Sequence, residues 1–137
     1  MTITPYDFDA VKIIGIPFPI SGPPGPTIVG FHFIITGYAM INFPGNERNP
    51  VDWVRAEVEF SLGPKISKLW ESSMIAFPAT FETLQSNPVN FGWGVDNAFT
   101  TFDEPSQMVV AHVLVVAKTA FSNILRIGFQ INIAGQK

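Results

Sequence analysis

Residues 54–62 read VRAEVEFSL, and this stretch decides the class of the fold. Its apolar residues alternate strictly with charged or polar ones, which is typical of a strand with one face on a core and the other in water. Residues 125–133, LRIGFQINI, repeat the pattern. A one-residue shift of register would invert both faces, so the alternation decides which side chains are buried. The side chains predicted to face inward include Val58, Phe60, Leu125, Ile127, Phe129, Ile131 and Ile133.

Other apolar runs predict further strands. Met108 to Ala117 is apolar on both faces, so we expect a central strand, or one whose outer face lies under another subunit. Ile28 to Phe43 is too long for one ordinary strand, so Gly30 and Gly37 are expected to bend or split it. Weaker strand candidates cover residues 11–16, 73–77 and 91–102.

Helical spacing is confined to two short segments. Ile66, Leu69 and Trp70 lie at i, i+3 and i+4, so Lys65 to Glu71 is predicted to form one or two turns, and Phe81 to Ser86 another. The remaining pattern is one of strands separated by turn residues. We therefore expect an all-β chain. It would form one domain over residues 1–137, an antiparallel two-sheet β-sandwich or jelly roll with about seven or eight strands and at most one or two short helical turns.

Prolines interrupt the chain at recurring places. Pro17 to Pro26, PFPISGPPGP, is predicted to be a surface loop, or a rigid connector that carries the first strand to another sheet or subunit. Three Phe-Pro pairs follow apolar runs, and proline lacks the N–H that continues a ladder. We expect strands to end at these prolines, which are Pro19, Pro44 and Pro78.

The composition points to self-association. Apolar residues make up 47% of the chain and charged residues only 14%, whereas about 25% charged is typical of globular proteins. A small core cannot absorb so much apolar surface, so we expect a homo-oligomer. The net charge is −3 and the basic residues are scattered, so nucleic acid is not an expected partner.

The cysteine content, the apolar runs and the first residues bear on the compartment and on membrane association. The chain has no cysteine, which excludes disulfides and thiolate chemistry. No apolar run is long enough to predict membrane insertion. No basic segment followed by an apolar one opens the chain, so we expect a cytoplasmic protein or one released without a classical signal.

Sequence motifs for catalysis are missing. His32 and His112 each lie in the middle of an apolar strand, where a hydrogen-bonded core or interface histidine is expected. The alternative is that they meet and bind a metal ion with an Asp or Glu, but no H-x-H or H-x-x-x-H spacing supports it. No serine lies in a nucleophile elbow, and no glycine loop fits a phosphate. We therefore expect no catalytic residue, no metal ligand and no cofactor.

The candidate ligand site lies in residues 90–104, NFGWGVDNAFTTFDE. Trp93 stands between two glycines, which suits stacking on a sugar ring, and Asp96 and Asn97 can hydrogen-bond hydroxyl groups. Asn90 is included in the predicted site. The alternative is a tryptophan buried in the sandwich, with glycines that admit a neighbouring strand.

From Ile75 to Ile133 the chain resembles the small sandwich domains called H-type lectins. The shared features are the Pro88-Val89 pair, Asp96 and the later Val-rich strand. The resemblance implies carbohydrate binding, and none of the family's sugar-contacting residues can be matched in this sequence.

The sequence as a whole leaves three function classes open. They are a non-enzymatic recognition module acting as a homo-oligomer, with carbohydrate as a possible ligand; a self-assembling shell, capsid or tail subunit; and an apolar-ligand binder or enclosed-pocket enzyme.

Overall fold

The described residues form eight β-strands. The computed structural model describes residues 2–19, 29–44, 53–83, 92–118 and 122–137, and none of these forms a helix. The all-β class predicted from the alternation is confirmed. The strands are β1 (Thr2–Ile3), β2 (Asp7–Pro19), β3 (Val29–Pro44), β4 (Val54–Ser61), β5 (Lys68–Thr83), β6 (Trp93–Asp103), β7 (Met108–Ala117) and β8 (Ser122–Gln136).

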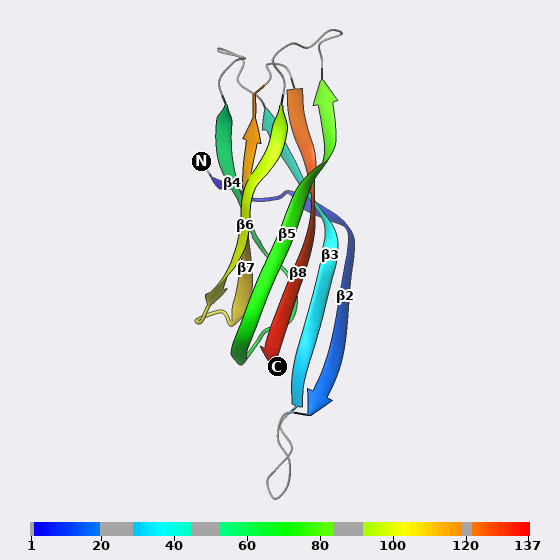
Figure 1. Ribbon diagram of the computed structural model, residues 1–137, viewed down its shortest axis with the longest axis vertical. Helices are drawn as coiled ribbons and strands as arrows, with labels where there is room; N and C mark the ends of the chain where they lie inside the picture. Colours follow the sequence, from blue (N-terminus) through cyan, green and yellow to red (C-terminus); the bar gives the residue numbers. More distant parts are fainter. Residues whose placement is uncertain (1, 20–28, 45–52, 84–91, 119–121) are drawn as a thin grey trace, which may run out of the picture.

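The strands form two four-stranded sheets that face each other as a β-sandwich (Figure 1). The short sheet has the order β1-β4-β7-β6, and the long sheet has the order β2-β3-β8-β5. Neighbouring strands are antiparallel except for the two-residue β1, which runs parallel to β4. At the lower end in Figure 1, the β2–β3 pair reaches beyond the short sheet, so part of its inner face lacks an opposing sheet.

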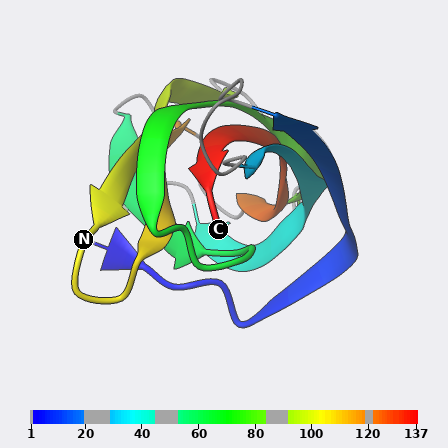
Figure 2. The ribbon, with the colours of Figure 1, turned by 90° about the horizontal axis from the view of Figure 1, so that it is seen from below.

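The two sheets approach closely along one side of the sandwich. There β5 of the long sheet runs beside β6 of the short sheet, as the end-on view shows (Figure 2). A hydrogen bond of 2.7 Å joins Ser72 Oγ to Thr100 Oγ1 across this seam. On the other side the chain passes from β1 to β2, and the Tyr6 amide donates to the carbonyl of Met40 at 3.1 Å. No other strand among the described residues pairs with β2 on the side that faces away from β3.

The core lies between the inner faces of both sheets. Val58 and Phe60 of β4 are buried, as are Ile127, Phe129 and Ile131 of β8, so the predicted burial of these five residues is confirmed. The rings of Phe60 and Phe129 meet across the core with centroids 5.0 Å apart. Ile66, in the loop between β4 and β5, is fully buried against the same cluster.

The predicted inward position of Leu125 is wrong. Ile124 is fully buried instead, and Leu125 is only half-buried. The pairing of β8 with β5 passes directly from Arg126 to Ile124, so Leu125 is an extra residue in a bulge. A bulge inserts one residue and exchanges the two faces beyond it. The alternation was therefore correct only from Ile127 onward.

The predicted division of the longest run at its glycines is also wrong. β3 is a continuous strand of 16 residues, and its register shift falls between Met40 and Phe43. Gly37 is instead opposite a bulge in β2, where the register jumps from Asp9 to Lys12. A Cβ on Gly37 would lie 3.1 Å from the Cα of Val11, so the glycine makes room for the neighbouring strand's bulge.

The helical turn predicted at Lys65 to Glu71 does not form. Lys68 already begins β5, and Trp70 is an extra residue in the pairing with β8. Strand β8 pairs along nearly the whole of β5, and this long-range ladder overrides a local spacing of three apolar residues. Of the second predicted turn, residues 81–83 belong to β5 and residues 84–86 lie outside the described residues.

The prolines lie at strand ends or in edge strands. Pro19 and Pro44 end β2 and β3 as predicted, but Pro78 lies inside β5. Both β2 and β5 are edge strands of the long sheet, where a missing N–H costs no ladder bond, and Pro78 borders a register shift. In the proline-rich segment Pro17 to Pro26, residues 17–19 are part of β2 and the remainder lies outside the described residues.

Candidate functional site

The outer face of the short sheet carries a cluster of titratable side chains around His112. The alternation of β4 turns Glu57 and Glu59 outward, and the β4–β7 register sets Glu59 directly opposite His112. On the other flank of β7, Phe99 of β6 pairs with His112. Three neighbouring strands therefore converge on one imidazole in the middle of the sheet.

Both ring nitrogens of His112 are hydrogen-bonded. Nδ1 lies 2.9 Å from Glu57 Oε1, and Nε2 lies 2.7 Å from Thr101 Oγ1. The Phe99 ring is stacked on the imidazole with centroids 4.7 Å apart and planes 8° from parallel. The predicted hydrogen-bonded histidine is confirmed, although it lies on the outer face of the sheet rather than in the core.

Glu59 completes this group, which we call the His112 cluster: Glu57, Glu59 and His112. One ligand atom from each of the three lies within 4.8 Å of the others. The order Thr101–His112–Glu57 is also that of a hydroxyl, a base and an orienting carboxylate. The group stands on a sheet face, and Glu57 also lines an open hollow of about 300 Å³ there. Its nitrogen and oxygen donors are of the kinds that bind a cation.

The outer face of the long sheet holds a second polar group, which we call the long-sheet hollow. It is lined by His32 of β3, Glu71 and Ser73 of β5, and Asn132 of β8, and its volume is about 230 Å³. Cross-strand pairing produces this arrangement, because Ala134 pairs with both His32 and Glu71. The small side chain of Ala134 leaves space between the two longer ones.

An aromatic pair borders the long-sheet hollow. Trp70 and Phe18 both lie over Gly30, where a Cβ would come within 2.7 Å and 2.8 Å of their rings. The ring centroids are 6.1 Å apart, and Trp70 remains 39% exposed. Gly30 is two residues before His32 on the same face of β3, so the rings stand at one end of the hollow. An exposed indole beside amide, hydroxyl and carboxylate groups is a set that can bind a polar ring.

Exposed apolar side chains surround this polar centre along both edges of the long sheet. On the outer face, Ile14 and Ile16 lie on β2, and Ile75 and Phe77 lie on β5. Ile16 is 49% exposed and Ile75 is 63% exposed. Ile13, on the opposite face of β2, is exposed as well. Strand β2 therefore presents apolar side chains on both faces.

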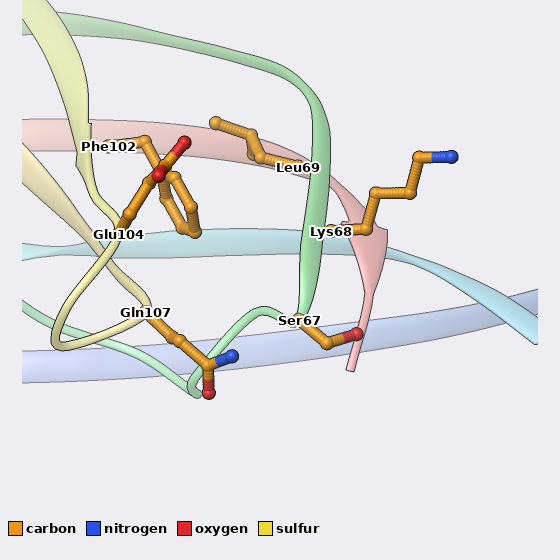
Figure 3. A pocket seen from close by; sticks show the side chains of 6 residues that line it. All are labelled: Ser67, Lys68, Leu69, Phe102, Glu104 and Gln107. Atoms are coloured by element: carbon orange, nitrogen blue, oxygen red, sulfur yellow. The ribbon is translucent and has the colours of Figure 1, made fainter.

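Another hollow opens at the lower end of the sandwich, with a volume of about 410 Å³ (Figure 3). Its walls come from the start of β5 and from the β6–β7 turn: Ser67, Lys68, Leu69, Phe102, Glu104 and Gln107. Figure 3 shows the Lys68 and Glu104 side chains pointing in different directions. The Ile66 amide donates to the Gln107 carbonyl at 2.8 Å, which ties the two walls together. This hollow is larger than the long-sheet hollow, but its two charged side chains, Lys68 and Glu104, do not point toward one another.

The described residues of the predicted ligand site do not all come together in the structure. Trp93 packs against the core, with its ring 4.3 Å from that of Phe81. Asp96 and Asn97 are exposed, and Asp96 borders a hollow on the outer face of the short sheet. Trp93 and Asp96 therefore lie on opposite faces of β6, and Asn90 lies outside the described residues. Gly92, which was expected to open one side of Trp93, instead admits the ring of Trp53.

The two histidines do not meet, because His112 is on the outer face of the short sheet and His32 on that of the long sheet. Neither polar group was predicted from the sequence, although the alternation in VRAEVEFSL already placed Glu57 and Glu59 on one outward face.

No family model, curated protein or solved structure matches this chain. The described residues include no helix of the length and apolarity required to cross a membrane.

Proposed function

We propose that the protein is a non-enzymatic recognition module that acts as a homo-oligomer through the apolar edges of its long sheet. The observation that carries this proposal is the exposure of β2. All residues from Asp9 to Pro19 are exposed, and the large apolar ones among them point to both faces. Pro17 and Pro19 protect one end of this edge, but the run from Ile13 to Ile16 exposes isoleucines with no charge or proline among them.

The kind of contact follows from the prolines of β2. Pro17 and Pro19 have no N–H, so that end of the edge cannot accept a further strand through a complete ladder. Side-chain packing is the remaining way to cover Ile14 and Ile16. A stable contact would remove more than about 1,000 Å² from water in total, which exceeds most crystal-packing contacts. The exposed apolar side chains available to such a contact lie along the two edge strands of the long sheet, β2 and β5.

Light scattering after size-exclusion chromatography tests the proposal. The wild type should have the mass of two or more chains at micromolar concentration. Ile16→Lys combined with Ile75→Lys should shift it to one chain, because two buried charges oppose the contact. Ser61→Lys, on the exposed end of β4 in the short sheet, is the matched control and should leave the mass unchanged.

The outcomes separate the related functions. A closed oligomer of fixed mass supports the recognition module, because closed symmetry uses up the contact surface. Open polymers that grow with concentration would instead favour a self-assembling shell or tail subunit. A wild-type mass of one chain at all concentrations would overturn both.

Carbohydrate is the candidate ligand, and the long-sheet hollow is the observation that favours it. Trp70 offers an exposed ring, and Ser73 and Asn132 offer hydroxyl and amide groups for sugar hydroxyls. A glycan array should show binding that is lost in both Trp70→Ala and Asn132→Ala. Trp93→Ala tests the site expected from the sequence. Loss in that variant alone, with its fold retained, would assign binding to β6 instead, and an array without any binding would remove the carbohydrate proposal.

A further inference from the structure

The geometry of the His112 cluster points to a further site: we propose that Glu57, Glu59 and His112 bind one divalent transition-metal ion of the Zn²⁺ class. This inference is independent of the proposed oligomer and of carbohydrate binding, because the cluster lies on the outer face of the other sheet. Four observations carry it, which are the backbone register, the ligand spacing, the second contact of the imidazole and the donor set.

The backbone register places the three ligands without strain. Glu57 and Glu59 are two residues apart on β4 and so share a face, and His112 is opposite Glu59 on β7. The β4–β7 ladder runs from Val54–Ala117 to Ser61–Val110 without a register shift. Strand β7 is paired on both sides, so the imidazole stands on a rigid part of the sheet. A site on regular strands holds its ligands more closely than one on loops.

The spacing is close to that of a bound site. The three ligand atoms lie within 4.8 Å of one another. Zinc binds histidine nitrogen and carboxylate oxygen at about 2.0–2.2 Å, so two ligands of one ion are separated by at most roughly 4 Å. Small rotations of the glutamate side chains are enough to close the difference. Two carboxyl groups beside one imidazole also provide both oxygen and nitrogen donors for a divalent cation.

Thr101 supplies the contact that a metal-binding histidine requires on its other nitrogen. Nδ1 faces Glu57 at 2.9 Å, and Nε2 faces Thr101 Oγ1 at 2.7 Å. A carboxylate only accepts, so without metal Nδ1 carries the hydrogen and donates to Glu57. With metal, Nδ1 coordinates through its lone pair and Nε2–H donates to Thr101 Oγ1. Such a partner fixes the tautomer and the ring orientation in protein metal sites. Phe99, stacked on the imidazole, limits rotation of the ring.

The donor set selects the class of metal. An imidazole with two carboxylates suits Zn²⁺, Mn²⁺, Co²⁺ or Ni²⁺, whereas Mg²⁺ and Ca²⁺ prefer oxygen ligands alone. Three protein ligands leave at least one coordination position for water. Glu57 and His112 retain part of their surface, at 30% and 14% exposed, so an ion can enter from solvent.

Titration of the tag-free, chelator-treated protein with ZnCl₂ and CoCl₂ tests the inference. Calorimetry should give one ion per chain, and Co²⁺ should produce visible absorption bands of a bound ion. Glu59→Gln should weaken binding about tenfold or more, because it removes one charged ligand and leaves the His112–Glu57 hydrogen bond in place. Glu71→Gln removes a carboxylate beside the other histidine, His32, and should leave the affinity unchanged.

Two further readouts separate a metal site from a plain hydrogen-bonded pair. In ¹⁵N NMR, Zn²⁺ should move the hydrogen of His112 from Nδ1 to Nε2. Thr101→Val should weaken binding by about 10- to 100-fold, as is usual for the loss of an outer-shell partner. Absence of binding, equal affinity in Glu59→Gln, or an effect confined to Glu71→Gln would each overturn the proposal. Thermal unfolding of the metal-free variants confirms that the fold is retained.

Discussion

The outer faces of the two sheets distribute polarity in opposite ways. On the short sheet, the central strand β7 presents Val110, Leu114 and Val116, and polar side chains of β4 and β6 stand on either side. On the long sheet, polar residues such as Gln130 and Asn132 occupy the central strand β8, and the apolar side chains lie toward the edges. On the short sheet the apolar side chains therefore lie along the central strand on either side of His112, whereas on the long sheet they lie toward the edges.

This difference shows on which face the excess of apolar residues over charged residues is exposed. Long polar side chains at the rim of the short sheet can cover part of a neighbouring apolar row with their stems, and Phe99 of β6 stays 38% exposed. No such rim exists around Ile16 or Ile75, and their apolar surface meets water directly. The long sheet therefore exposes more large apolar side chains than the short sheet, and its face is the one we assign to self-association.

The largest expected effect concerns the core that the two sheets share. Phe129→Ala should lower the free energy of unfolding by about 3–5 kcal/mol, because it opens a cavity next to Phe60. Urea denaturation monitored by fluorescence measures the change. Ile75→Ala, on the outer face, is the control and should cost less than about 1 kcal/mol in the monomeric background, since most exposed changes are small. Equal costs for the two variants would show that the facing of β5 or β8 is misassigned.

A second effect should be confined to the long sheet. Gly37→Ala places a Cβ 3.1 Å from the backbone of Val11, so it should push the bulge of β2 outward. Overpacking of this kind costs about 1–3 kcal/mol. Hydrogen exchange should then increase in β2 and leave β7 unchanged. Gly94→Ala is the matched control, because its Cβ would meet only Val116 at 3.4 Å. Faster exchange spread over both sheets would contradict a local origin.

A third, smaller effect should be confined to the short sheet. Thr101→Val keeps the branched shape of the side chain and removes the oxygen that contacts His112 Nε2. The loss should be about 0.5–1.5 kcal/mol in the metal-free protein, which is the usual net value of one hydrogen bond. Thr36→Val, on the outer face of the long sheet, makes the same isosteric change away from His112. If Thr36→Val destabilised the protein as much, the cost could not be attributed to the histidine contact.

The smallest effect is expected for the ion pair of the long sheet. Arg126 and Asp9 are joined at 3.0 Å, but both side chains are largely exposed, at 37% and 49%. Asp9→Asn should therefore change stability by about 0–1 kcal/mol, and less at high salt. Thermal unfolding at low and high ionic strength measures it. A loss of several kcal/mol would mean that Asp9 is covered in the assembled protein, which would itself locate part of the oligomer contact.

The alternating segments were predictable because each residue's face depends only on its neighbours in the chain. Val58 and Phe129 illustrate this success. Leu125 marks its limit, since a bulge depends on the partner strands and leaves no local mark in the sequence. Lys65 to Glu71 failed for a related reason, because pairing with a strand more than fifty residues away outweighed local spacing.

The candidate sites were less predictable than the fold. Glu57 and Glu59 stood out on one face of a predicted strand, but nothing near them in the sequence indicated His112, which reaches them only through the β4–β7 pairing. Of the glycines beside Trp93, Gly92 makes room for the Trp53 ring, which fits the alternative that these glycines admit a neighbouring segment. A site is better predicted from which strands pair than from the residues that flank a single side chain. In this chain most paired strands are distant in sequence, so their pairing could not be predicted.

The central position of β8 in the long sheet has a consequence for how the molecule is made. Phe31 of β3 pairs with Gly135, so the sheet joins segments from opposite ends of the chain. During synthesis from the amino terminus, β2, β3 and β5 leave the ribosome before the strand that links them. Their apolar faces must wait for β8, and a topology dominated by such distant pairs folds slowly. The nascent chain should therefore depend on holdase chaperones until Gln136 has emerged, and refolding from denaturant should show the long sheet and the core forming together in one late step.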